Sequence, residues 1–156
     1  MTSKPTALHI DRVSNKTYIG RNARGGEVRI GTSDADGALS PGELLQLAMA
    51  ACGILSSDHT LASRLGDDFA ARVDITATKP HGENRYDTIT TNILTNMSSI
   101  EPEKQTALID RAKRAIERYC TVSHTLDHGA EHTVTIRNDA HLAAQIEPEG
   151  TSGRLT

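Results

Sequence analysis

The sequence SPGELLQLAMAACGIL, residues 40–55, decides the fold. Ser40 is a residue type that caps helix N-termini, Pro41 lies where its missing N–H costs nothing, and Glu43 completes a capping box. The rest of the stretch is apolar on nearly all sides, and a helix of that kind is buried all round. We therefore predict a central helix, in the middle of the fold or at a dimer interface, that runs on to a C-terminal cap at Gly66.

The sequence around this helix alternates between apolar and polar residues, as half-buried strands do. We expect strands at residues 8–10, 15–20, 27–31, 70–78, 85–97 and 131–137. A second long helix is expected up to Tyr119, and either Ser99 caps it or Pro102 begins it. One short helix is expected around residues 141–146. Runs of strands separated by two long helices, without regular βαβ alternation, indicate an α+β fold.

Composition limits the classes of protein to which the chain can belong. With 156 residues, it is expected to form a single domain over residues 1–138, followed by a polar tail over residues 139–156. Two cysteines are too few for a disulfide scaffold. Seventeen basic against twenty acidic residues, with only four aromatic rings, disfavour nucleic-acid binding. No apolar run approaches about 20 residues, so we expect a soluble cytoplasmic protein without membrane association.

The two cysteines are the first candidates for chemistry. Cys52 is either a small hydrophobe in a buried helix or a reactive thiol, and reactivity requires a lowered pKa. The dipole of its own helix acts only within the first turn, so we expect a neighbouring cation to be required. Cys120, at the end of the second helix, by itself favours a structural role. As a pair, one in or beside each long helix, they also fit a redox role.

Other catalytic classes find little support. A spacing of four residues separates Cys120, His124, His128 and His132. On a helix, this spacing could place metal ligands on one face. Gly129 and the alternating pattern that follows should end any helix before the last of these, so we expect no metal site and no cofactor. The chain contains no G-x-S-x-G motif of a serine hydrolase and no glycine-rich nucleotide loop.

Two motifs together resemble a known family. The helix SPGELL…AAC, residues 40–52, resembles the "(N/S)PxELL…A(A/G)C" helix of the OsmC/Ohr proteins, the osmotically inducible and organic hydroperoxide resistance proteins. The segment CTVSHTL, residues 120–126, is similar to that family's second motif, "CPVSxxL", with Thr121 in place of Pro. The order of the elements between the cysteines also matches, and the resemblance covers roughly residues 8–137.

The resemblance implies a thiol peroxidase on an intertwined α+β homodimer, with antiparallel sheets outside two central helices. By that analogy Cys52 is the peroxidatic thiolate, which attacks the O–O bond of a hydroperoxide, releases alcohol or water and becomes a sulfenic acid. Cys120 then condenses with it to a disulfide, which a dithiol reductant reopens.

The resemblance also implies an arginine and a glutamate beside the reactive cysteine. Arg24, followed by two glycines, fits the arginine, which would lower the pKa of Cys52 and orient the peroxide; it also fits a solvated turn residue. In the peroxidase members of the family the glutamate commonly follows the proline directly, where this chain has Gly42. Glu43 is one place later, and it also fits a purely capping role. Nine residues of helix, a rise of about 13.5 Å, separate Glu43 from Cys52, so an arginine bridge or the other subunit would have to join them.

Two functions therefore remain open. Retention of both cysteines together with Arg24 favours a dimeric peroxidase that acts on organic hydroperoxides or hydrogen peroxide. The departures at Gly42 and Thr121 favour a catalytically silent OsmC-like domain that binds a small apolar ligand or senses redox state.

Overall fold

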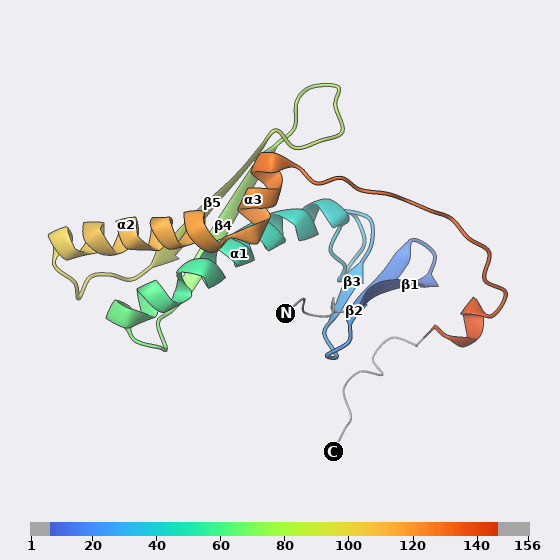
Figure 1. Cartoon of the computed structure of the whole chain (residues 1–156), viewed down its shortest axis with the longest axis horizontal. Helices are drawn as coiled ribbons and strands as arrows, with labels where there is room; N and C mark the ends of the chain where they lie inside the picture. Colours follow the sequence, from blue (N-terminus) through green and yellow to red (C-terminus); the bar gives the residue numbers. More distant parts are fainter. Residues whose placement is uncertain (1–6, 147–156) are drawn as a thin grey trace, which may run out of the picture. The chain divides into compact units, whose positions relative to one another are not determined.

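The computed structural model describes residues 7–146, and the chain divides into two compact units. The first comprises the residues up to Leu44 and those from Thr133 onward, and the second comprises Leu45–His132. Three α-helices and two antiparallel sheets confirm the α+β prediction (Figure 1). The elements are β1 (Leu8–Ser14), β2 (Thr17–Asn22), β3 (Glu27–Ile30), α1 (Pro41–Leu65), β4 (Ala71–Thr78), β5 (Thr88–Thr95), α2 (Pro102–Tyr119), α3 (Thr121–His128) and the 3-10 turn η1 (Leu142–Ala144).

The first unit contains the sheet β1-β2-β3, an antiparallel meander. Its register pairs Ile10 with Gly20 and Gly20 with Val28, so one face is apolar. The opposite face carries charge, because Arg21 lies between Asp11 and Glu27 at 2.8 Å and 2.7 Å. The Arg21 side chain is only 4% exposed, and two carboxylates satisfy its charge.

Helix α1 begins with the predicted capping box. The backbone N–H of Ser40 donates to Glu43 Oε2 at 2.7 Å, and the N–H of Glu43 donates to Ser40 Oγ at 3.3 Å. The helix ends where predicted, at Gly66, whose φ of +91° is a left-handed conformation that suits glycine. Both predicted ends of α1 are confirmed.

Burial along α1 follows a single stripe rather than all sides. The buried residues are Ala50, Gly53, Ser57 and Leu61. Outside this stripe the helix is apolar but open, with Leu47 42% and Leu55 74% exposed. One chain therefore buries only part of a helix whose sequence is apolar on nearly all sides.

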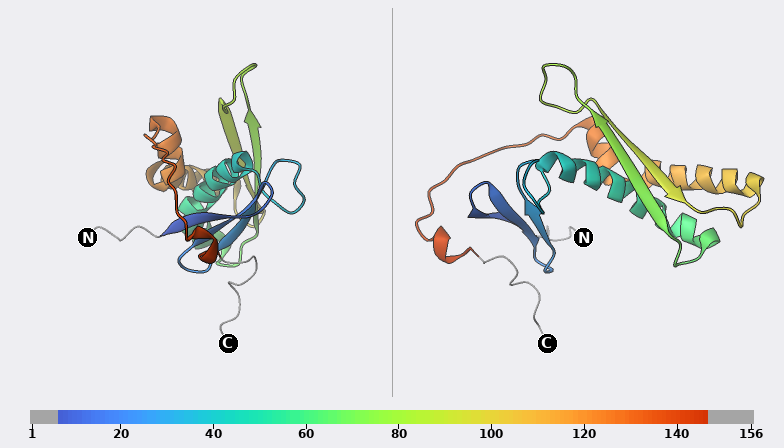
Figure 2. Two further views of the ribbon diagram at one scale, coloured as in Figure 1. Left: turned by 90° about the vertical axis from the view of Figure 1, so that its right-hand side faces the viewer. Right: turned by 180° about the vertical axis from the view of Figure 1, so that it is seen from behind.

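The second unit packs α1 against α2 and the β4–β5 hairpin, as all three views show (Figures 1 and 2). Its core is formed by Leu61, Leu108 and Ala112, with half-buried side chains such as Phe69 and Ile93 packed against them. The hairpin pairs residues 71–78 with residues 88–95, within the two strands predicted there. Of the two starts considered for the second helix, Pro102 begins it.

The prediction of a last strand at residues 131–137 was wrong. The segment forms no ladder, and Val134 and Ile136 are 81% and 97% exposed. A strand needs a neighbour whose backbone groups pair with its own, and the described part of the chain places none beside this segment. The short helix expected at residues 141–146 is confirmed as the 3-10 turn η1. The end of the predicted tail, residues 147–156, lies outside the described residues.

Helix α3 is the one element with no counterpart in the sequence-based assignment. It follows α2 directly and ends at Gly129, whose φ is +72°. The expectation that Gly129 stops any helix before His132 is therefore confirmed. What the sequence did not indicate is that a helix begins immediately after Cys120.

Candidate functional site

The junction of α2 and α3 is built around Cys120. Its backbone N–H donates to the Ile116 carbonyl at 2.9 Å and so ends α2. Its carbonyl accepts from the N–H of His124 at 3.1 Å, and its sulfur accepts from the N–H of Ser123 at 3.4 Å, so it also caps α3. Cys120 is extended, with φ −76° and ψ 96°. The first amide groups of α3 are thereby brought to a cysteine sulfur.

Cys52 reaches the same helix N-terminus from α1. Its half-buried thiol accepts hydrogen bonds from the backbone N–H of Val122 first of all, then from the Cys120 side chain, the N–H of Thr121 and the Ser56 hydroxyl. Together these donors outweigh the effect of partial burial and lower the pKa of Cys52 below that of an ordinary thiol. The sequence predicted that a neighbouring cation would be required, whereas the groups that lower this pKa are hydrogen-bond donors, chiefly from α3.

Cys120 has the opposite character. Its side chain is 0% exposed, and this burial raises the pKa of the thiol. The hydrogen bond from Ser123 N–H works against that rise, whereas the adjoining Cys52 adds to it. Both cysteines are in the thiol form and touch each other. The site thus joins an accessible, acidic thiol to a buried, weakly acidic one, which is an arrangement suited to attack by the first and resolution by the second.

Three groups of this site were missed by sequence reasoning. Ser56 follows Cys52 by one helical turn, so the predicted helix could have revealed it. The amides of Thr121 and Val122 are backbone groups and depend on α3. For α3 the sequence marks only the end, at Gly129, because Cys120 is not one of the residue types that usually begin a helix.

Arg24 and Glu43 both belong to the first unit, whereas Cys52 and Cys120 belong to the second. Arg24 lies in the turn between β2 and β3, where its backbone N–H donates to Asn22 Oδ1 at 2.8 Å. Glu43 is exposed in the capping box, and hydrogen bonds from the backbone and hydroxyl of Ser40 hold the pKa of its carboxyl below the usual range. The structure brings the two cysteines together, and the roles of Arg24 and Glu43 toward them stay predictions.

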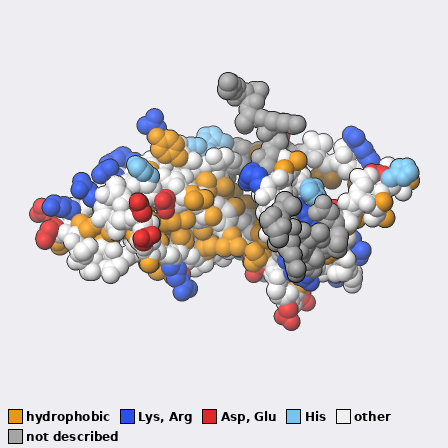
Figure 3. Space-filling view, turned by 90° about the horizontal axis from the view of Figure 1, so that it is seen from below, with side chains coloured by type: hydrophobic (Ala, Val, Ile, Leu, Met, Phe, Trp, Pro, Cys, Tyr) orange, Lys and Arg blue, Asp and Glu red, His pale blue; other side chains and the backbone are white. Residues whose placement is uncertain are grey.

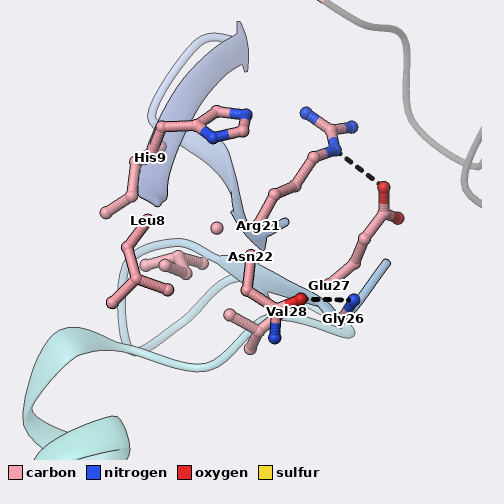
Figure 4. A pocket seen from close by; sticks show the side chains of 10 residues that line it. Leu8, His9, Arg21, Asn22, Gly26, Glu27 and Val28 are labelled. Carbon is pink, nitrogen blue, oxygen red and sulfur yellow. Dashed lines mark hydrogen bonds and ion pairs between the residues drawn. The ribbon is translucent and has the colours of Figure 1, made fainter. Parts of the chain in front are cut away.

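The first unit also contains a cavity of about 700 Å³ beside its sheet (Figure 4). Its walls are largely apolar and include Leu8, Ile10, Val28 and Ile30. The Arg21–Glu27 ion pair lies on one side of it (Figure 4). Arg21 was also missed by sequence reasoning, although the strand register, once known, places it on the same face as Glu27.

Two further observations concern metals and membranes. Among residues 7–146, no group of three or more His, Cys, Asp or Glu side chains is placed to hold a metal ion. Within the same described range, no helix combines the length and apolar character needed to cross a bilayer.

Comparison with known proteins identifies the family. The family profile described as "OsmC-like protein" matches residues 32–135, a segment that contains both cysteines. The chain belongs to the OsmC-like family. Uncharacterized proteins of Mycobacterium bovis and Mycobacterium tuberculosis are 39% identical to it over 124 residues, which is 80% of this chain and 90% of each relative.

Solved structures share the OsmC-like fold. An OsmC-like protein from Mycoplasma pneumoniae is 12% identical and superimposes with a TM-score of 0.57, over 82% of this chain and 91% of its own. A Lactobacillus casei structure, provisionally named a redox protein, is 18% identical with a TM-score of 0.51, over 88% of this chain and 96% of its own. At these identities the likeness shows the fold alone, and the fold prediction is confirmed at the level of the OsmC-like family.

Proposed function

We propose that this OsmC-like protein is a thiol-dependent peroxidase that reduces organic hydroperoxides or hydrogen peroxide. The observation that carries the proposal is the contact between an accessible Cys52, whose pKa is lowered, and a buried Cys120, whose pKa is raised, at one helix N-terminus. Family membership and a structural neighbour named as a redox protein support a redox-related role in general.

In the first step the Cys52 thiolate attacks one oxygen of the hydroperoxide. A sulfur–oxygen bond forms as the O–O bond breaks, so the sulfur is oxidised by two electrons to a sulfenic acid. The other oxygen leaves with the electron pair of the O–O bond, takes a proton and departs as alcohol or water. The donors around Cys52 favour this step because they lower the pKa of the thiol and so raise the fraction of thiolate at a given pH.

In the second step the Cys120 sulfur attacks the sulfenic acid. The sulfur–sulfur bond forms, the sulfenic oxygen leaves with its electron pair, and it takes the Cys120 proton to depart as water. Oxidation of Cys52 prepares this step, because a neutral sulfenic acid no longer carries the charge that raises the pKa of Cys120. A dithiol then reduces the disulfide in a reducing compartment, which we propose to be the cytoplasm.

We further propose that Arg24 orients the peroxide and that Glu43 holds the Arg24 guanidinium in place. Both residues stand on or beside elements of the first unit. Glu43 remains ionised over a wide pH range because the Ser40 hydrogen bonds lower the pKa of its carboxyl, as an arginine partner requires.

We propose a homodimer as the working form. Helix α1 leaves Leu47 and Leu55 exposed on its apolar outer face, and residues 131–137 leave Val134 and Ile136 exposed without a strand partner. On the face shown in Figure 3, hydrophobic side chains gather in a broad area over the second unit. We expect a second copy of the chain to cover this surface, because the α1 sequence is apolar on nearly all sides and one chain buries only one stripe of it.

A turnover assay tests the proposed activity. Reduced protein is mixed with excess dithiothreitol and cumene hydroperoxide, and the loss of peroxide is followed over time. The wild type should consume many equivalents, and Cys52→Ser should consume no more than dithiothreitol alone. Cys120→Ser serves as the second arm and should lose the disulfide intermediate while keeping the first oxidation step.

A second candidate function has one observation in its favour. The cavity of about 700 Å³ in the first unit has apolar walls and could hold a small apolar ligand. If wild type and Cys52→Ser consume peroxide equally slowly, the peroxidase proposal is wrong, and binding of a fluorescent apolar probe to that cavity becomes the measurement of interest.

A further inference from the structure

A second cavity, of about 500 Å³, lies within the second unit and away from the cysteines. It is bounded by the last turn of α1, the loop before α2 and the first half of α2. The end of α1 (green) and the beginning of α2 (yellow) lie side by side in Figures 1 and 2. Arg64, in the lining, stands twelve residues after Cys52 in the same helix, a rise of about 18 Å. The cavity is therefore separate from the cysteine site, and its volume suits a small molecule.

Positive side chains dominate the lining of this cavity. Arg64 comes from α1, and Lys104 and Arg111, seven residues apart, come from one face of α2. Glu101 is the one acidic residue that the described part of the chain places in the lining. Within residues 7–146, none of the three positive side chains has a hydrogen-bond or ion-pair partner. The lining thus has an excess of two positive charges, in a chain whose net charge is −3.

The stability of the two helices accounts for only one of these positive charges. Arg64 lies in the last turn of α1, where a positive charge interacts favourably with the helix dipole. Lys104 lies in the first turn of α2, where the same interaction is unfavourable. The positions three and four residues on either side of Arg111 hold no carboxylate with which it could pair. The three charges also repel one another, and an anion between them would remove that repulsion.

We propose that this cavity binds the phosphate group of a small phosphorylated molecule. A phosphate monoester carries a charge of about −1.5 to −2 at neutral pH, which matches the excess of two positive charges in the lining. Guanidinium groups bind phosphate oxygens through two parallel hydrogen bonds, and a lysine adds a further donor. The organic part of the molecule contacts Ile100 and Leu108, which line the same cavity. The proposal involves neither cysteine and is independent of the proposed peroxidase activity.

Isothermal titration calorimetry with phenyl phosphate measures this binding, and benzoate, which has the same ring but one negative charge, is the comparison ligand. We expect benzoate to bind at least about tenfold more weakly than phenyl phosphate. Arg111→Gln should weaken phenyl phosphate binding by about tenfold, because it removes a charged donor. Arg114→Gln is the matched control: it removes an exposed arginine of the same helix that does not line the cavity, and it should bind as the wild type does.

Glu101→Gln gives a result that a poorly folded variant could not imitate. It removes the negative charge from the lining, so we expect phenyl phosphate to bind about threefold more tightly than to the wild type. The Glu101 side chain makes no capping hydrogen bond at the start of α2, so the substitution leaves the hydrogen bonds of the helix intact.

Three results would overturn the proposal. They are no binding of phenyl phosphate to the wild type, equal affinities of the wild type and Arg111→Gln, and equal affinities for phenyl phosphate and benzoate. A lower mass of Arg111→Gln in analytical ultracentrifugation would assign the positive charges to contact with a second copy of the chain and would also contradict it. Cys52→Ser should bind phenyl phosphate as tightly as the wild type, so a failure of the peroxidase proposal would be recognised separately.

Discussion

Cys52 and Cys120 are the same residue type in contact with each other, yet their surroundings move their pKa values in opposite directions. Hydrogen bonds led by the Val122 amide lower the pKa of Cys52, whereas complete burial raises that of Cys120. Sequence order was enough to pair these residues as candidates. It could not show that they touch or what lowers the Cys52 pKa, because the donors are backbone amides of a helix that the sequence analysis did not assign.

Alkylation as a function of pH should separate the two thiols. Since only the thiolate reacts, the modification rate of Cys52 should reach half its maximum below the pH expected for an ordinary cysteine. That of Cys120 should reach it above that pH and should also be slowed by burial. Mass spectrometry of iodoacetamide-treated peptides gives both profiles. A first modification at Cys120, or coincident profiles, would contradict the assignment of roles.

Arg24 provides a second prediction for single residues. If its guanidinium lies beside the thiolate in the working protein, Arg24→Ala should raise the Cys52 pKa and slow its oxidation. Arg12→Ala removes an exposed arginine from the same unit and should leave both quantities unchanged. An alkylation profile of Arg24→Ala that matches the wild type would remove Arg24 from the site.

At the scale of elements, α1 was predictable and α3 was not. The Ser40–Glu43 capping box and Gly66 mark both ends of α1 in the sequence itself. Helix α3 has only eight residues, three of them the β-branched Thr121, Val122 and Thr125, so local propensity favours other structures. Its N-cap is Cys120, a residue type that is not among the usual helix caps, so the local pattern gave no sign of a helix start there.

The capping box itself can be tested. Ser40→Ala removes the hydroxyl that accepts from the Glu43 amide and should lower the free energy of unfolding by about 1 kcal/mol. Urea denaturation at fixed protein concentration measures the change, and Ser40→Asp, which keeps an acceptor at the same place, should restore most of it. Equal stability of Ser40→Ala and the wild type would show that the box contributes little to α1.

At the scale of the whole molecule, a single chain leaves several large apolar side chains exposed to solvent. The alternation at residues 131–137 predicted a strand that the structure does not contain: Ile136 is 97% exposed, and no strand among residues 7–146 pairs with this segment. The outer face of α1 is likewise exposed. A sequence pattern shows that a segment needs a strand partner or a cover for its apolar face. It does not show whether the same chain or a second copy provides that partner.

The homodimer proposal makes a direct prediction here. Leu55 is 74% exposed on α1, so Leu55→Glu should leave a folded monomer while removing the interface. Analytical ultracentrifugation of wild type and variant at equal concentrations measures the mass of each. Leu142→Glu, a change of the same kind in the turn η1, should remain dimeric. A monomeric wild type at micromolar concentration would contradict the proposal.

The central claim is that Cys52 attacks peroxide and Cys120 resolves the product, and the most direct test is one turnover followed by intact-mass analysis and thiol counting. Reduced protein receives one equivalent of cumene hydroperoxide without any reductant. We expect the wild type to lose both thiols and two hydrogens of mass. Cys120→Ser should gain one oxygen at Cys52 that dimedone traps, and Cys52→Ser should not change. Survival of both thiols in the wild type, even with peroxide in excess, would show that Cys52 and Cys120 do not carry out this reaction.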